Sequence, residues 1–107
     1  MSGHYILDVL HKIVPVDAVT WSQWFEKQGE CENRVVAKDV VGDATVSTVF
    51  HGIDHRFGGN GPPILFETMI FINGEDAGDY QERCCTWDEA VAQHAKALAL
   101  VHAKAVP

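Results

Sequence analysis

Two apolar stretches flank a glycine- and proline-rich segment in the middle of the chain. The stretches 44–53 and 64–72 are rich in β-branched and aromatic residues, which favour strands. The segment between them, 54–63, is longer than a hairpin turn, and connections of this length within a small domain are typically functional or mobile. The pattern therefore predicts two strands joined by a long loop.

A hairpin is predicted just before this region. Residues 34–41 read RVVAKDVV, and Gly42-Asp43 places glycine first, as a type II′ turn requires. On the returning strand, Val46, Thr48 and Phe50 share one face, because side chains alternate along a strand. After a turn at Asn73-Gly74, residues 78–85 add a weaker strand.

The strand 64–72 is apolar on both faces. One face carries Ile64, Phe66, Ile70 and Ile72, and the other carries Leu65, Met69 and Phe71. Such a strand is typically central and covered on both sides. Two short helices cover about one face of a small sheet, so we expect a homodimer that buries the second face.

Helical signals occur on either side of these strands. Asp17 is placed to cap a helix that ends near Gln28, with Gly29 as its stop. Residues 86–89 read TWDE, which matches the capping-box pattern of a second helix. The apolar stripe expected to face the sheet from this second helix consists of Val91, His94, Ala95, Leu98 and Val101.

These elements together predict an α+β fold, an antiparallel sheet of three to five strands with two helices packed on it. A chain of 107 residues is expected to form a single domain, 1–107, with one core. Residues 5–10 are a short apolar run that an edge strand would explain, and Pro15 is expected to interrupt the chain after it.

The negative charge of the chain restricts the kind of partner that it can bind. The formal net charge is −7, which disfavours direct binding to nucleic acid. Residues 75–89 contain six acidic residues and one arginine and therefore hold −5 of that charge. This acidic patch can occupy a basic groove on a partner protein, or it can simply keep a turn and a helix start solvated. Its candidate binding residues are Glu75, Asp76, Asp79 and Glu82.

Compartment signals are consistent with the cytoplasm of a host cell. No segment reaches the roughly 18 apolar residues of a membrane span, and the N-terminal run lacks an export-signal pattern. The three cysteines, Cys31, Cys84 and Cys85, form no CxxC pair, so reduced thiols are expected. No cofactor is expected.

The candidate chemistry lies near the loop. His51, Asp54, His55 and Glu67 combine imidazole and carboxylate groups, which suit a transition metal or acid–base catalysis. The alternative is structural: Asp54 and His55 order the loop by hydrogen bonds, and Glu67 forms an ion pair with Arg56 or a nearby histidine. Asp54, His55 and Arg56 are also candidate binding residues.

The central motif, VSTVFHGIDHRFGGNGPPILFETMIF, and the later TWDEAVAQH resemble a family of small uncharacterised proteins encoded mainly by bacteriophages and prophages. The resemblance also includes YILD and TWSQWFE near the start and so covers most of the chain. No established activity accompanies this family. This chain differs from the family pattern at two positions: His51 stands where an apolar residue is expected, and Asn60 interrupts an expected run of glycines.

The resemblance implies a small accessory protein that binds a host or phage protein, as anti-CRISPR inhibitors do. On that interpretation the acidic patch contacts the partner and the protein is not an enzyme. The alternatives are a small hydrolase or metal-dependent enzyme that uses His51, Asp54, His55 and Glu67, and a structural or assembly dimer.

Overall fold

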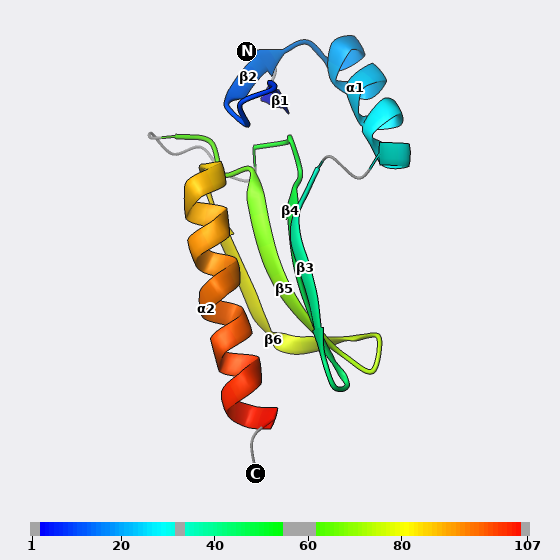
Figure 1. Ribbon diagram of the computed structural model, residues 1–107. Coiled ribbons are helices and arrows are strands. Elements are labelled where there is room, and N and C mark those ends of the chain that lie inside the picture. Colours follow the sequence, from blue (N-terminus) through cyan, green and yellow to red (C-terminus); the bar gives the residue numbers. More distant parts are fainter. Residues whose placement is uncertain (1–2, 32–33, 55–61, 106–107) are drawn as a thin grey trace.

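The computed structural model describes residues 3–31, 34–54 and 62–105, which form an α+β fold (Figure 1). In chain order the elements are β1 (His4–Leu7), β2 (Ile13–Val16), α1 (Ala18–Cys31), β3 (Val35–Val41), β4 (Ala44–Phe50), β5 (Phe66–Ile72), β6 (Glu75–Cys84) and α2 (Trp87–Ala105). The predicted fold class is confirmed.

The main sheet is an antiparallel meander of four strands in the order β3-β4-β5-β6. Gly42, first in the β3–β4 turn, has a φ of 59°, as a turn with glycine at that position requires. Asn73 and Gly74 both have positive φ, which is typical of the tight turn that such a pair forms. Because that turn is so short, β6 starts at Glu75 and is longer than the predicted strand 78–85.

The strand β4 ends before the predicted boundary at Ile53, because the chain turns at Gly52. This glycine has a φ of +73°, and a Cβ there would lie 2.6 Å from Phe25 Cε2 and from Trp21 Nε1. Its carbonyl accepts a hydrogen bond from the Tyr5 amide at 2.7 Å. Gly52 therefore lets α1 and β1 approach the end of the sheet closely.

Pro15 does not end the N-terminal strand region. The strand β2 contains Pro15, which is the register partner of Tyr5 in β1. A proline is tolerated here because each strand of a two-stranded ribbon is an edge strand. This second strand was missed by the sequence pattern.

Both helices begin where the sequence predicts. Asp17 Oδ1 accepts a hydrogen bond from the Thr20 amide at 2.7 Å and caps α1, but Gly29 does not stop that helix, which continues to Cys31. Glycine inside a helix costs only about 1 kcal/mol, so the neighbouring turns retain the helix. At α2, Thr86 and Glu89 exchange two hydrogen bonds of 3.1 Å, as in a capping box.

The helix α2 lies along one face of the four-stranded sheet, and α1 packs on β1 at one end (Figure 1). The core beneath α2 has two apolar parts. One contains Leu7, Phe50, Leu65, Phe66 and Ala90, and the other contains Ala44, Val46, Ile70, Ala97 and Val101.

The predicted inward stripe of α2 is wrong at two positions. Val91 and Ala95 are exposed, whereas Ala90, Gln93 and Ala97 are buried beside His94 and Val101. The buried polar residues Gln93 and His94 bind polar side chains of the sheet. A stripe identified by hydrophobicity alone does not include them. Among the described residues, no helix has the length and apolar character needed to cross a membrane.

Candidate functional site

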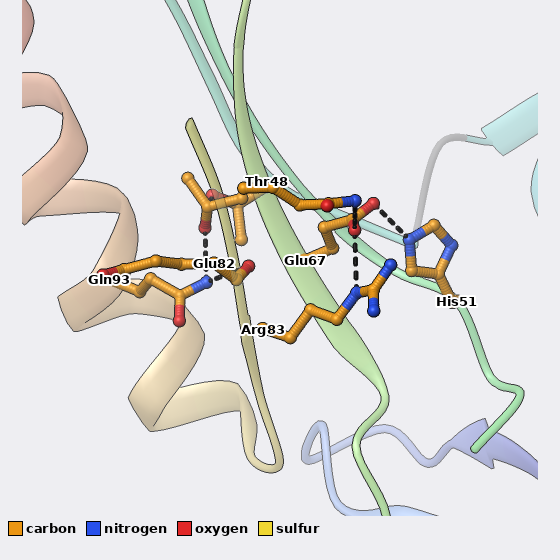
Figure 2. A network of polar contacts seen from close by, with 8 residues as sticks. Thr48, His51, Glu67, Glu82, Arg83 and Gln93 are labelled. Atoms are coloured by element: carbon orange, nitrogen blue, oxygen red, sulfur yellow. Dashed lines mark hydrogen bonds and ion pairs between the residues drawn. The ribbon is translucent and has the colours of Figure 1, made fainter. Parts of the chain in front are cut away.

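Glu67 is a buried carboxylate in β5, on the sheet face opposite α2, and is only 6% exposed. Its Oε1 accepts a hydrogen bond from His51 Nε2 at 3.0 Å. Its Oε2 accepts from Arg83 Nε at 2.9 Å and from Gln81 Nε2. We call these four residues the Glu67 cluster; Figure 2 shows His51 and Arg83 approaching Glu67 from neighbouring segments.

Strand register builds the cluster. In the β5–β6 pair, Arg83 is the partner of Glu67 and Gln81 is the partner of Met69. His51 directly follows β4, in which Val49 is the partner of Glu67. Directly opposed residues share a face in antiparallel pairs, so the donors converge on one carboxylate.

The cluster keeps Glu67 ionised. Burial by itself raises the pKa of Glu67, but hydrogen bonds from His51, Arg83 and Gln81 outweigh it, so the pKa lies below its ordinary value. A carboxylate with such a pKa only accepts hydrogen bonds near neutral pH, and its oxygens are already occupied by three donors. The arrangement therefore stabilises a buried charge and is poorly suited to donate a proton to a substrate.

The structure separates the predicted cluster into parts. It brings His51 and Glu67 together, whereas Asp54 Oδ1 accepts a hydrogen bond from the Ile64 amide at 3.0 Å. Asp54 therefore joins the two ends of the segment between β4 and β5. This agrees with the structural alternative, in which Asp54 orders the loop by hydrogen bonds. His55 and Arg56 lie outside the described residues.

The sequence missed Gln81 and Arg83 as partners of Glu67. The signal that identifies them is the β5–β6 register, which shifts between Met69 and Phe71. The turn at Asn73-Gly74 alone would place Tyr80 opposite Glu67, so the sequence does not show that Arg83 is the partner. Within residues 3–31, 34–54 and 62–105, no three His, Cys, Asp or Glu side chains are grouped in a way that can hold a metal ion.

A second polar network lies between α2 and the sheet, and we call it the polar layer. Asp39 Oδ2 lies 2.8 Å from His94 Nε2, and His94 Nδ1 lies 2.8 Å from the Thr48 hydroxyl. The Thr48 and Thr68 hydroxyls are 2.7 Å apart, and Gln93 Nε2 donates to Thr68 at 2.8 Å. These contacts connect β3, β4, β5 and α2, and the layer separates the two apolar parts of the core.

The directions of these hydrogen bonds are mutually consistent. The Asp39 carboxylate only accepts, so His94 Nε2 carries the proton and donates it. In that tautomer Nδ1 accepts from Thr48, and Thr48 in turn accepts from Thr68. Each polar group of the layer thus has a partner, which removes the penalty of burying it.

The order Asp–His–Thr is also that of a nucleophile-activating triad. However, Thr48 and Thr68 have no exposed surface, because α2 covers them. A substrate cannot reach a hydroxyl in that position. The polar layer therefore holds α2 on the sheet in one register.

The described members of the predicted acidic patch have different surroundings. Glu75 is exposed at the start of β6. Glu82 forms an ion pair with Lys96 at 3.2 Å and accepts a hydrogen bond from the Tyr80 hydroxyl. The side chains of Asp76 and Asp79, which belong to β6 by position, lie outside the description.

Neither of the described cysteines, Cys84 and Cys85, belongs to a disulfide. Burial, together with the nearby Glu89 charge, raises the pKa of Cys84 to about 11. Because the thiolate is the reactive form, this cysteine is a poor nucleophile near neutral pH.

Comparisons with protein-family models, with curated proteins and with solved structures give no match.

Proposed function

We propose that this protein acts without catalysis, by binding another protein through the sheet face opposite α2. We call this surface the open face. Its described residues, assigned by strand register, include Val35, Lys38, Val40, Thr45, Ser47, Val49, Glu67, Met69, Phe71, Gln81 and Arg83. The observation that carries the proposal is that α2 packs on the opposite face, and neither described helix packs on this one (Figure 1).

The open face has a mostly apolar row near the β3–β4 turn, with charged neighbours. Val40, Thr45 and Phe71 are register partners across β3, β4 and β5, and Val40 is 68% exposed. Antiparallel sheets commonly leave one face to water, but that face is then mostly polar. A face that carries an exposed valine together with the half-buried Phe71 and Met69 is more typical of a contact surface for a protein.

The acidic patch adjoins this row. Asp76 is the register partner of Phe71 on the open face, whereas Glu75, the partner of Ile72, belongs to the other face at the same end of the sheet. A partner with an apolar centre and a basic margin is therefore complementary to this end of the sheet. The net charge of −7 strengthens the attraction to such a partner at long range.

The proposed class of partner rests on the charge and on the phage-family resemblance. A basic surface on a protein is frequently one that binds nucleic acid. We therefore propose a host or phage nucleic-acid-binding protein as the partner, with a bacterial immunity effector, the target of an anti-CRISPR protein, as the leading example. The charge and the resemblance both support an accessory protein that acts in the host cytoplasm.

The test compares two valine substitutions. The immobilised full chain is exposed to bacterial lysate, and bound proteins are identified by mass spectrometry. Val40→Glu on the open face is expected to weaken binding of the captured partner at least about tenfold, because a charge is placed in the contact. Val91→Glu makes the same change on the exposed side of α2 and is expected to bind as the wild type does.

The same two variants define the opposing results. Equal binding by both variants, with both chains folded by circular dichroism, would show that the open face is not the contact surface. A wild-type chain that captures nothing basic from host or phage lysate would contradict the proposed partner class.

A further inference from the structure

The loop between β1 and β2 is a rigid turn. Asp8 Oδ1 accepts hydrogen bonds from the amides of Leu10 and Lys12 at 2.8 and 3.0 Å. The Asp8 amide donates to the Lys12 carbonyl, and the His11 amide donates to the Asp8 carbonyl. His11 has a φ of 63°, a conformation that a non-glycine residue retains only when its surroundings fix it.

A ring contact ties this turn to the start of α2. The His11 ring stacks on Trp87 with 3.7 Å between ring centroids and 8° between planes. Trp87 also packs edge-on against Phe66 of the core. The turn is therefore anchored at both its backbone and its tip, and it loses little conformational entropy when it binds something.

Two large aliphatic side chains project from this rigid turn. Val9 is 95% exposed and Leu10 is 71% exposed. Beside them lies a recess of about 340 Å³ between the turn and the first residues of α2. Its apolar walls include Leu10, Ile13 and Trp87, so Leu10 belongs to both the projection and the wall of the recess.

We propose that this surface joins two copies of the chain around a twofold axis. An isologous interface requires that each surface be its own complement. A projection next to a recess meets this condition, because Val9 and Leu10 of each copy enter the recess of the other. The recess is at the lower end of the size range for pockets that hold small molecules, and it accommodates one or two aliphatic side chains.

The charges at the recess are self-complementary as well. Lys12 and Asp88 both line it, one from the turn and one from the first turn of α2. When the two copies exchange their projections, Lys12 of each faces Asp88 of the other. Lys12 and Asp88 thus balance each other across the contact, although each copy carries −7 overall.

This dimer contact differs from the one expected from sequence, which used the second apolar face of residues 64–72. That face is the open face, which the proposed function assigns to another protein. The twofold contact leaves the open face accessible, so the inference does not depend on the proposed function.

The first test measures the mass of the full chain in solution. Sedimentation equilibrium from about 10 µM to about 1 mM should show a monomer–dimer equilibrium. Val9→Glu should weaken dimerisation at least about tenfold. Val19→Glu makes the same change at another exposed valine, on α1, and should leave the dissociation constant within about twofold.

The second test reverses the charged pair. Lys12→Asp alone should weaken the dimer, because the introduced carboxylate would face Asp88 of the other copy. Adding Asp88→Lys should restore dimerisation in a chain whose helix content is unchanged.

The inference is overturned by a wild-type chain that stays monomeric throughout this range. It is equally overturned by a dimer that tolerates Val9→Glu as well as Val19→Glu, or by a double charge reversal that restores nothing. None of these results bears on partner capture by the open face.

Discussion

At the scale of single residues, Glu67 shows how three neighbours make a buried charge acceptable. Moving a carboxylate out of water is costly unless it is paired and hydrogen-bonded. His51, Gln81 and Arg83 supply those bonds from two other strand segments. Removing the charge while keeping the shape is therefore destabilising, because the donors lose a carboxylate that accepts from all of them.

We predict that Glu67→Gln lowers the free energy of unfolding by about 2 kcal/mol at pH 7. Since the pKa of Glu67 is lowered by folding from its ordinary value of 4.5, the stabilisation is present above that pH and is lost as the pH falls further. Urea unfolding at several pH values should show the difference between wild type and variant shrinking in acid.

The matched control for this variant is Glu26→Gln, on the exposed surface of α1. It should change the free energy of unfolding by less than about 0.5 kcal/mol. If the two variants were equally stable, the Glu67 cluster would contribute nothing to the fold.

At the scale of elements, α2 is positioned by the polar layer as well as by its apolar contacts. Apolar contacts are not directional, so by themselves they specify the position of a helix along a sheet less strictly than hydrogen bonds do. The Thr48–His94 hydrogen bond of 2.8 Å is directional and exists in only one register. A buried polar layer of this kind favours one arrangement over its neighbours.

We predict that Thr48→Val lowers the free energy of unfolding by about 1–3 kcal/mol, because His94 Nδ1 is left buried without a donor. Combining it with His94→Leu should cost less than the sum of the two single changes, with a coupling of at least about 1 kcal/mol. Chemical denaturation of all four chains measures that coupling.

Thr45→Val makes the same chemical change on the open face of β4 and serves as the control. Its effect should stay within about 0.5 kcal/mol. Strict additivity of the Thr48 and His94 changes would mean that the two residues act independently.

The elements that the sequence predicts well are those with local signals. The caps at Asp17 and Thr86 and the turn at Gly42 each depend on a few adjacent residues. The strand β2 was missed because Pro15 is an obstacle in a central strand but not in a two-stranded ribbon.

The candidate site was only partly predictable, for a related reason. His51 and Arg83 each lie 16 residues from Glu67 along the chain, and both reach it through strand pairing, which a local pattern does not show. Likewise, Gln93 is buried because Thr68 and the Glu82 carbonyl bind it. A polar residue can be buried when a residue of another element hydrogen-bonds to it, and the sequence around the polar residue does not show whether such a partner exists.

At the scale of the whole molecule, charge is unevenly distributed. The stretch 75–89 holds most of the net negative charge, and part of it is committed internally, since Glu82 pairs with Lys96. Among the described acidic residues of β6, the exposed Glu75 is therefore better suited than Glu82 to attract a basic partner.

We predict that reversing Glu75, Asp76 and Asp79 to lysine slows association with the captured partner and flattens its dependence on salt. Exposed charges act over roughly 10 Å at 0.1 M salt and mainly set the association rate. Surface plasmon resonance at several salt concentrations measures both effects. Glu75→Lys in the patch and Glu26→Lys outside it change the net charge equally. An equally slower association rate in both would mean that net charge, and not the patch, sets the rate.

The meander order of the main sheet has a consequence for how the chain folds as it is synthesised. Each of its strands pairs only with strands adjacent to it in sequence, so hairpins can form one after another behind the ribosome, each closing a loop of modest length. The helix α2 follows all four strands. Until it emerges, Val46 and Ile70 lack the helix residues that cover them, and the nascent sheet presents this apolar surface to chaperones.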